Sequence, residues 1–297
     1  MTFWQLTVPT SAEISDGLTN FLWEQGALGV VEEEVPSEPP RLRAFFPETA
    51  SSTALLRAVS QYRASLGALG FAVTPLEPEI MPLHDGEWAS AWQQSFPPLR
   101  VGERLLVVPP WEARDERSIG GRLQVIIEPG RAFGTGHHGS TEGCLALLEN
   151  ALAGPDGIPR QALDIGTGTG ILAIAAVKLG VPAVVAVDVD PDAIAAARLN
   201  AEKNGCADRI MLELAGPERA AGAAPFPLIL ANLLSHTHLA LLPRYASLTT
   251  PGGHLILGGI LGDEAGSVTE AARGHGFQCA ARRVIDGWAS LLFVSTS

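Results

Sequence analysis

Residues Leu163–Gly170 read L-D-I-G-T-G-T-G, and this stretch decides which fold the chain adopts. An apolar run ends in Asp164, three glycines follow at alternate positions, and the sequence I-L-A-I-A-A-V-K after them favours a helix. A strand, a tight glycine turn and a helix together let a backbone approach a cofactor closely at a helix N-terminus. The stretch therefore predicts a cofactor-binding β-α-β unit.

The spacing of the glycines separates two classes of cofactor. A second apolar run, A-V-V-A-V, ends in Asp188, where such folds place an acid that binds ribose hydroxyls. A dinucleotide fingerprint requires G-x-G-x-x-G, and Ile171 stands where its third glycine would be. The pattern D-x-G-x-G-x-G followed by V-D-x-D favours S-adenosylmethionine over NAD, so we predict a methyltransferase, with an NAD-dependent oxidoreductase as the alternative. Asp190 precedes Pro191 and is expected to cap the next helix.

From Cys144 onward the expected strands and helices alternate, which is typical of a doubly wound, mostly parallel sheet. Strands are expected at Ala162–Ile165, Ala183–Asp188, Ile210–Leu214, Leu228–Ala231, His254–Leu257 and Ser290–Ser295. Apolar runs from Leu105 onward predict further strands ahead of a glycine-rich loop. The fold class is therefore α/β, with a Rossmann-like class I methyltransferase domain over residues 99–297.

The first 78 residues have a different pattern, which predicts a small α+β domain. Strand, helix, strand, strand, helix and strand are expected at Phe3–Val8, Ser11–Gln25, Ala27–Glu34, Leu42–Phe46, Thr53–Leu69 and Phe71–Ile80. The order β-α-β-β-α-β is that of a ferredoxin-like unit. Such a fold catalyses nothing by default and often serves recognition, so we expect residues 1–78 to recognise the substrate.

A linker helix is expected over residues 79–98. Trp88, Trp92 and Phe96 recur every four residues and therefore share one face of a short helix. We expect these rings to dock the linker on a neighbouring domain, and an aromatic face that binds a peptide is the alternative. A linker of this kind would let the catalytic domain reach several amines. The alternative is a rigid two-domain enzyme that reaches one target amine.

The composition limits the class of partner and the location. The net charge is −12 and no run is rich in lysine or arginine, so no basic face for nucleic acid phosphates is expected. The charge suits a basic protein partner, and it suits ordinary acidic solubility equally well. Three widely spaced cysteines indicate a reducing, cytoplasmic location. Neither a signal peptide nor a membrane span is expected, because the most apolar stretch, Ile171–Val187, contains a lysine, a glycine and a proline.

Several candidate residues are expected at the carboxyl ends of the parallel strands, where such sheets bind ligands. The carboxylate of Asp164 can accept hydrogen bonds from the amides of the glycine turn, lie near the positive charge of the cofactor, or do both. Gly166 and Gly168 lack side chains where the cofactor approaches the backbone. Gly170 is expected to allow close packing of strand and helix.

Asn232 and a glycine-rich loop complete the candidate site. Asn232 follows the strand L-I-L-A, so its side-chain oxygen can orient a substrate amine, and a loop cap is the alternative. The loop Glu128–Thr141 reads E-P-G-R-A-F-G-T-G-H-H-G-S-T. We expect it to lie over the bound cofactor, with Thr141 donating a hydrogen bond and with Phe133 and His138 as further cofactor contacts.

The sequence gives little support for a metal site or for a nucleophilic side chain. Four histidines suggest a metal, namely His137, His138, His236 and His238, but no carboxylate or cysteine shows ligand spacing with them, so no metal site is predicted. No G-x-S-x-G elbow is present and no cysteine lies in a reactive context. Methyl transfer needs no protein nucleophile, because the methyl group of S-adenosylmethionine is already activated.

These motifs resemble the bacterial ribosomal-protein methyltransferases of the PrmA family. The resemblance covers essentially the whole chain, including the W-x-x-x-W linker, E-P-G-R-A-F-G-T-G, the glycine turn, V-D-V-D-P-D-A-I, A-N-L-L and G-G-H-L-I-L-G-G-I-L. It implies transfer of methyl groups to the N-terminal α-amine and lysine ε-amines of ribosomal protein L11 of the large subunit, modified while free by a monomeric enzyme. It also implies cofactor contacts at Thr141, Gly166, Asp188 and Asn232.

One segment departs from the family pattern. The family usually reads G-T-G-T-H-P-T-T in the loop, and this chain reads G-T-G-H-H-G-S-T. His138 and Thr141 match the family, whereas His137, Gly139 and Ser140 do not. Gly139 in place of proline is expected to loosen the loop, by about 0.4–1 kcal/mol of added unfolded-state freedom. The expected consequence is weaker cofactor binding or a loop that closes differently.

The substrate amine must be neutral to accept a methyl group. At pH 7 about one lysine in a few thousand is neutral, a penalty of roughly 4–5 kcal/mol, against about 1 kcal/mol for an α-amine. We expect the site to desolvate the amine beside the positive charge of the cofactor, with Asn232 orienting it through its carbonyl oxygen. Methylation of another protein, of RNA or of a small molecule is an alternative, as is a non-catalytic cofactor-binding module.

Overall fold

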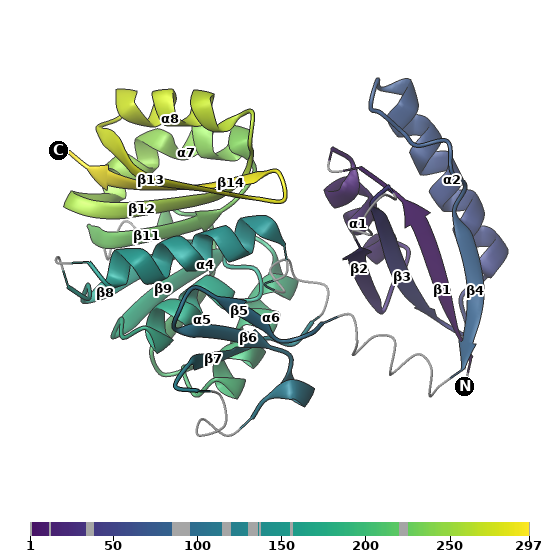
Figure 1. The fold of residues 1–297 in the computed structure, drawn as a ribbon, viewed down its shortest axis with the longest axis horizontal. Helices are drawn as coiled ribbons and strands as arrows, with labels where there is room; N and C mark the ends of the chain where they lie inside the picture. The colour runs from purple at the N-terminus through teal and green to yellow at the C-terminus, as the bar shows by residue number, and fades with distance from the viewer. Residues whose placement is uncertain are drawn as a thin grey trace. The chain divides into compact units, whose positions relative to one another are not determined.

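The structure is a computed structural model of the 297-residue chain. It describes residues 2–11, 13–33, 39–84, 96–114, 120–129, 136, 138–154, 157–219 and 225–296. The chain divides into two compact units, Met1–Phe96 and Pro97–Ser297 (Figure 1).

The first unit is an antiparallel sheet with helices on one face. Its elements are β1 (Thr2–Pro9), α1 (Ser15–Glu24), β2 (Gly29–Glu33), β3 (Arg41–Pro47), α2 (Ser52–Ala68) and β4 (Glu79–His84). The strands lie in the order β2-β3-β1-β4. Alternate residues of β1 and β3 pack against both helices, in a core that includes Leu6, Leu42, Leu18 and Val59. The element order is the β-α-β-β-α-β that the sequence predicts.

The last strand of this unit lies later in the chain than predicted. A strand was expected over Phe71–Ile80, whereas β4 begins at Glu79. The buried side chain of Arg63 explains the difference, because its guanidinium donates to the carbonyls of Thr74 and Leu76, both at 2.7 Å. These bonds hold the segment before β4 as irregular chain, so its carbonyls do not join the sheet.

The expected linker helix over residues 79–98 is also revised at its start. Residues 79–84 form β4, which pairs with β1, so the first unit extends beyond residue 78 to Phe96. The side chain of Phe96 is buried. Trp88 and Trp92, on which the linker helix was predicted, lie outside the described residues.

The second unit contains the predicted doubly wound sheet. In chain order after α4 (Gly139–Leu152), its elements are β8 (Gln161–Ile165), α5 (Ile171–Lys178), β9 (Ala183–Asp188), α6 (Pro191–Lys203), β10 (Ile210–Leu214), β11 (Phe226–Asn232), α7 (Ser235–Leu248), β12 (Thr249–Leu261), α8 (Ala265–Gly274), β13 (Phe277–Ile285) and β14 (Trp288–Ser295). The strand order is β10-β9-β8-β11-β12-β14-β13. The strands from β10 to β12 run parallel, and β14 is antiparallel to both of its neighbours. The prediction of a mostly parallel sheet is therefore confirmed.

Helices cover both faces of this sheet (Figure 1). One core packs α4 and α5 against the sheet, and the other packs α7 and α8 against the opposite face. Helix α5 is apolar on all sides because a second, three-stranded sheet covers it, made of β5 (Leu99–Val101), β6 (Leu105–Val108) and β7 (Leu123–Ile126). A short 3-10 helix, η1 (Pro110–Glu112), follows β6. None of the helices in the described part of the chain is long and apolar enough to cross a membrane.

The topology brings the expected site residues to one edge of the sheet. The chain leaves β8 in the middle of the sheet, and the strands on its two sides, β9 and β11, are reached in opposite directions. Ligands bind at such a reversal, outside the carboxyl ends of the strands. Ile165 pairs with both Val187 and Ala231, so the glycine turn, Asp188 and Asn232 follow at neighbouring positions.

Candidate functional site

The glycine turn adopts backbone conformations that favour glycine. The φ angles of Gly166, Gly168 and Gly170 are 69°, 54° and 81°, in the left-handed region where a β-carbon is disfavoured. A β-carbon at Gly166 would lie 2.5 Å from the Cδ2 of Leu233, so the turn also passes close to the chain after β11. A side chain at Gly166 would therefore collide with Leu233, and the turn is restricted to glycine by both its conformation and its packing.

Gly170 has a different packing role from the predicted one. A β-carbon there would lie 3.1 Å from the Cβ and 3.2 Å from the Cα of Ala197. Ala197 belongs to α6, so this glycine allows two helices to approach each other at the start of α5. The expectation of close strand–helix packing at Gly170 is wrong, because the nearest atoms come from a helix.

Asp188 supports the glycine turn from the end of β9. Its Oδ2 accepts from the amide of Gly168 at 2.9 Å, and its Oδ1 accepts from the amide of Asp190 at 3.0 Å. Each carboxylate oxygen has further acceptor capacity, so binding of ribose hydroxyls stays a prediction. Asp190 in turn caps α6 by accepting from the amide of Asp192 at 2.9 Å, which confirms its predicted role.

Asp164 is a buried carboxyl group beneath the turn. Its Oδ2 accepts from the hydroxyl of Thr167 at 2.7 Å and from the amide of Ala173 at 3.2 Å. The amide therefore comes from the first turn of α5, not from the glycine turn as expected. Its Oδ1 is buried without a hydrogen-bond partner among the described residues. Burial raises the pKa of Asp164 to about 7, against the lowering effect of the bonds from Thr167 and Ala173.

Asn232 and Thr141 meet at the opposite side of the site. The Nδ2 of Asn232 donates to the Oγ1 of Thr141 at 3.2 Å, although the two residues are 91 positions apart. Thr141 is fully buried in the first turn of α4. The Oδ1 of Asn232 is buried and has no hydrogen-bond partner in the part of the chain that the structure describes. The hydrogen bond thus fixes the orientation of the Asn232 amide and leaves its Oδ1 as a buried acceptor without a described partner.

Two glycines of β12, Gly258 and Gly259, lie close to the Asn232 side chain, and this contact was not predicted from the sequence. Gly258 is the cross-strand partner of Asn232, and a β-carbon on it would lie 2.7 Å from the Oδ1 of Asn232 and 2.3 Å from the Sγ of Cys144. At Gly259, where φ is 72°, a β-carbon would lie 2.4 Å from the carbonyl oxygen of Leu233. The register with β14 shifts here, which marks a β-bulge. The sequence signal for this bulge is the pair of adjacent glycines inside a strand, which often marks a bulge or a close backbone approach.

The structure describes residues 128–129, 136 and 138–141 of the loop Glu128–Thr141. Phe133 and His137 lie outside the described residues. His138 caps α4 through its Nδ1, which lies 3.4 Å from the amide and 2.8 Å from the hydroxyl of Ser140, and its ring packs on Trp288. Gly139 is the first residue of α4, where a β-carbon would lie 2.5 Å from the carbonyl oxygen of Ile285. This departure from the family pattern is therefore in close contact with β13.

Two asparagines, Asn200 in α6 and Asn204 at the C-cap of that helix, anchor the chain that leads into this loop. Asn204 accepts from the amide of Ile126 at 2.9 Å and donates to its carbonyl at 2.7 Å, as a neighbouring strand would. Asn200 accepts from the amide of Glu128 and donates to the carbonyl of Thr169, both at 2.9 Å. The segment after β7 is thus tied to the glycine turn. Sequence reasoning missed both residues, because an asparagine in a helix or at its C-cap has no local signal for such a distant contact.

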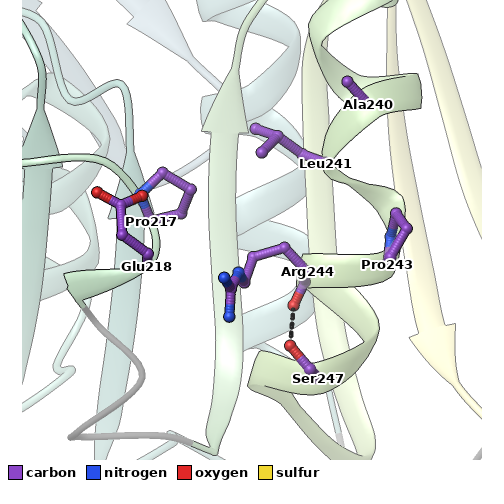
Figure 2. A pocket seen from close by; sticks show the side chains of 7 residues that line it. All are labelled: Pro217, Glu218, Ala240, Leu241, Pro243, Arg244 and Ser247. Atoms are coloured by element: carbon purple, nitrogen blue, oxygen red, sulfur yellow. Dashed lines mark hydrogen bonds between the residues drawn. The ribbon is translucent and has the colours of Figure 1, made fainter.

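A groove beside α7 contains none of the predicted site residues. It has a volume of about 410 Å³ and lies between the chain after β10 and the outer side of α7 (Figure 2). Its lining is Pro217, Glu218, Ala240, Leu241, Pro243, Arg244 and Ser247. The hydroxyl of Ser247 donates to the carbonyl of Arg244 at 2.8 Å within the helix. We therefore place the candidate site at the strand ends and not in this groove.

The histidines do not form a metal centre among the described residues. No group of three or more histidine, cysteine, aspartate or glutamate side chains could hold a metal ion there. His238 uses both ring nitrogens for hydrogen bonds, with the carbonyl of Gly258 at 2.7 Å and the hydroxyl of Tyr245 at 3.1 Å.

The arrangement fits S-adenosylmethionine. Two buried acceptor oxygens, Asp164 Oδ1 and Asn232 Oδ1, lack partners among the described residues, and they belong to the neighbouring strands β8 and β11. The glycine turn follows β8, and Asp188 lies at the end of the next strand. Acceptor oxygens around an open backbone suit a ligand with hydroxyl, amino and cationic groups.

Comparison with known proteins identifies the family of the chain. Residues 2–296 match the family described as ribosomal protein L11 methyltransferase (PrmA). A ribosomal protein L11 methyltransferase of Marinobacter nauticus is 37% identical over 90% of either chain, and one of Syntrophotalea carbinolica is 34% identical over 98% of either chain. A solved structure of a ribosomal protein L11 methylase from Lactobacillus delbrueckii subsp. bulgaricus is 30% identical, with a TM-score of 0.60, and covers 67% of this chain and 99% of that chain. The chain belongs to the ribosomal protein L11 methyltransferase (PrmA) family, and it is an S-adenosylmethionine-dependent methyltransferase of class I fold.

Proposed function

We propose that the chain transfers methyl groups from S-adenosylmethionine to the N-terminal α-amine and to lysine ε-amines of ribosomal protein L11, and that Asn232 orients the accepting amine. The observation that carries the proposal is the Thr141–Asn232 hydrogen bond, which leaves the Asn232 carbonyl oxygen buried and without a described partner. A carbonyl oxygen accepts from an amine N–H, and it thereby directs the nitrogen lone pair toward the methyl group.

The residues of the site divide into a cofactor side and an amine side. We assign the backbone of Gly166 and Gly168, with the carboxylate of Asp188, to the cofactor, and Asp164 Oδ1 to its charged end. Thr141 and Asn232 complete the contacts from the other side. His138 and Phe133 stay predicted cofactor contacts. When bound, the cofactor supplies an activated methyl group on a sulfonium centre, so the protein has to position the amine and keep it neutral.

Protonation of the amine sets the largest demand on the chain. The site has to exclude water from the amine, because burial beside a positive charge favours the neutral form. The neutral side-chain oxygen of Asn232 suits this task better than a carboxylate, which would stabilise the protonated amine. Positioning then supplies about 7–11 kcal/mol of the remaining barrier. We expect the rate to rise with pH, more steeply and further for lysine than for the α-amine.

The test is transfer of labelled methyl from S-adenosylmethionine to purified, unmodified L11, with peptide mapping of the product. Label is expected on the N-terminal amine and on lysines, with the predicted pH dependence when chemistry limits the rate. Cofactor binding by calorimetry without any transfer would contradict the proposal and favour a binding module or another substrate. A flat pH profile would contradict the role of desolvation.

Asn232 is tested against a matched asparagine of α4. Asn232→Ala removes the carbonyl oxygen and should lower kcat about 100-fold, as loss of one polar group aimed at the reacting centre typically does. Asn150→Ala changes an exposed asparagine and should leave kcat near the wild-type value. Equal kcat values for the two variants would contradict the assigned role.

We further propose that the first unit recognises L11 as a ferredoxin-like domain and that the enzyme acts as a cytoplasmic monomer on free L11. The net charge of −12 favours a basic protein over a nucleic acid as the partner. Amide hydrogen exchange of the full chain, with and without unmodified L11, tests this assignment. Protection is expected within residues 2–33 and 39–84, and protection confined to residues 97–296 would contradict it.

A further inference from the structure

A buried polar network lies behind Asn232, on the α7 side of the sheet. His238 is fully buried in α7, and its Nε2 lies 2.7 Å from the carbonyl oxygen of Gly258. Its Nδ1 lies 3.1 Å from the hydroxyl of Tyr245, two turns further along the same helix. The same Gly258 carbonyl accepts from the amide of Leu233 at 3.2 Å.

The partners determine which nitrogen of His238 carries the proton. A carbonyl oxygen only accepts, so Nε2 must carry the hydrogen that is donated to Gly258. Nδ1 then presents a lone pair, and the Tyr245 hydroxyl donates to it. Burial lowers the pKa of His238 to about 4, so the ring is neutral at neutral pH. The network therefore has one defined tautomer and directs one donor at Gly258.

The position of Gly258 connects this network to the candidate site. Gly258 is the cross-strand partner of Asn232, and it lies at the β-bulge where β12 shifts register against β14. Two donors, Leu233 N and His238 Nε2, occupy its carbonyl oxygen. The backbone of the bulge is close enough to the Asn232 side chain that a β-carbon on Gly258 would lie 2.7 Å from its Oδ1. A shift of the bulge would therefore move the amide oxygen.

We propose that His238 is a positioning residue for methyl transfer, which holds the Gly258 carbonyl and thereby fixes the place of the Asn232 side-chain oxygen. This inference rests on the proposed role of Asn232. An apolar side chain would fill the same buried volume without the cost of burying an imidazole. The imidazole instead donates to the one carbonyl that lies across from the residue assigned to the amine, and Tyr245 sets its tautomer.

Three variants of the full chain separate positioning from packing. His238→Met fills similar volume without a donor and should lower kcat about 10- to 100-fold, the loss expected for a misplaced group. His238→Gln keeps an N–H donor in reach of Gly258 and should recover most of that loss. Leu242→Ala, a buried substitution in the same helix, should lower Tm and leave kcat near the wild-type value below the transition.

Two outcomes of these assays would overturn the inference. One is a folded His238→Met variant with wild-type kcat, and the other is a His238→Gln variant that is as slow as His238→Met although its Tm is higher. A purely structural role predicts that kcat is insensitive to all three substitutions at a temperature where each variant is folded.

A readout without turnover distinguishes this inference from the proposed function. The side-chain amide signals of Asn232 and the exchange rate of the Leu233 amide, both measured by NMR, should change in His238→Met and return toward wild type in His238→Gln. If wild type does not methylate L11 but these signals respond, the proposed function fails and the coupling stands. If wild type methylates L11 and the signals do not respond, the inference fails alone.

Discussion

The two sides of the candidate site are built in different ways. On the β8 side, Asp164 finds its partners Thr167 and Ala173 three and nine positions along the chain. On the β11 side, Asn232 is held by a threonine 91 positions away and by the backbone of a strand that follows α7. A site that is half local and half assembled can lose the second half to a distant substitution while the first half stays intact.

The largest expected effect concerns the buried carboxyl of the local side. The pKa of Asp164 is raised from 3.8 to about 7 in the folded chain. Between these values the folded chain binds one proton more than the unfolded chain, so the stabilising contribution is full below pH 4 and is lost as pH rises through 7. Asp164→Asn removes this dependence. The free energy of unfolding of Asp164→Asn minus that of wild type should therefore increase by about 4 kcal/mol between pH 4 and pH 7.

Urea unfolding of wild type and Asp164→Asn at several pH values measures this difference. Asn232→Ala is the control from the assembled side, because it changes no titratable group and should show a constant difference from wild type. A constant difference for Asp164→Asn as well would mean that its carboxyl titrates normally in the folded chain.

A smaller effect is expected where the assembled side depends on close backbone contact. Gly259→Ala and Gly252→Ala place a side chain at the same φ, 72°, in the same strand, but only Gly259 has atoms within 4 Å of the added carbon. Both should lose about 1–2 kcal/mol for the left-handed conformation. Gly259→Ala should lose about 1–3 kcal/mol more, because the new carbon meets the Leu233 carbonyl. Equal free energies of unfolding would show that β12 can move away without cost.

The smallest expected effect concerns the hydrogen bond between Thr141 and Asn232 on the β11 side of the site. Thr141→Val preserves shape but removes the acceptor of the Asn232 Nδ2, and Thr141→Ser keeps it. The valine variant should lose about 1 kcal/mol of stability and bind the cofactor about 5- to 10-fold more weakly, since the amide is no longer oriented. Calorimetry measures the affinity, and a serine variant as weak as the valine variant would point to packing instead of the hydrogen bond.

Much of the second unit could be predicted from the sequence. The strands Ala183–Asp188 and Ile210–Leu214 have the predicted bounds, because apolar runs end there at residues that favour turns and caps. Strand Phe277–Ile285 was missed, since it is an edge strand whose residues are mostly exposed and whose apolar residues do not alternate with polar ones. The shift of the last strand of the first unit depends on Arg63, whose contacts are invisible in the local pattern.

The glycine turn, the alternation of strands and helices around it and the family were determined by the sequence alone, because each depends on motifs whose residues are close in the chain. The place of the Asn232 oxygen was decided only by the tertiary structure. Thr141 comes from α4, Gly258 from β12 and His238 from α7, and their hydrogen bonds form only when the sheet has brought these elements together. A hydrogen bond between distant residues leaves no periodic trace in the sequence, since it constrains one atom pair and not a repeating face.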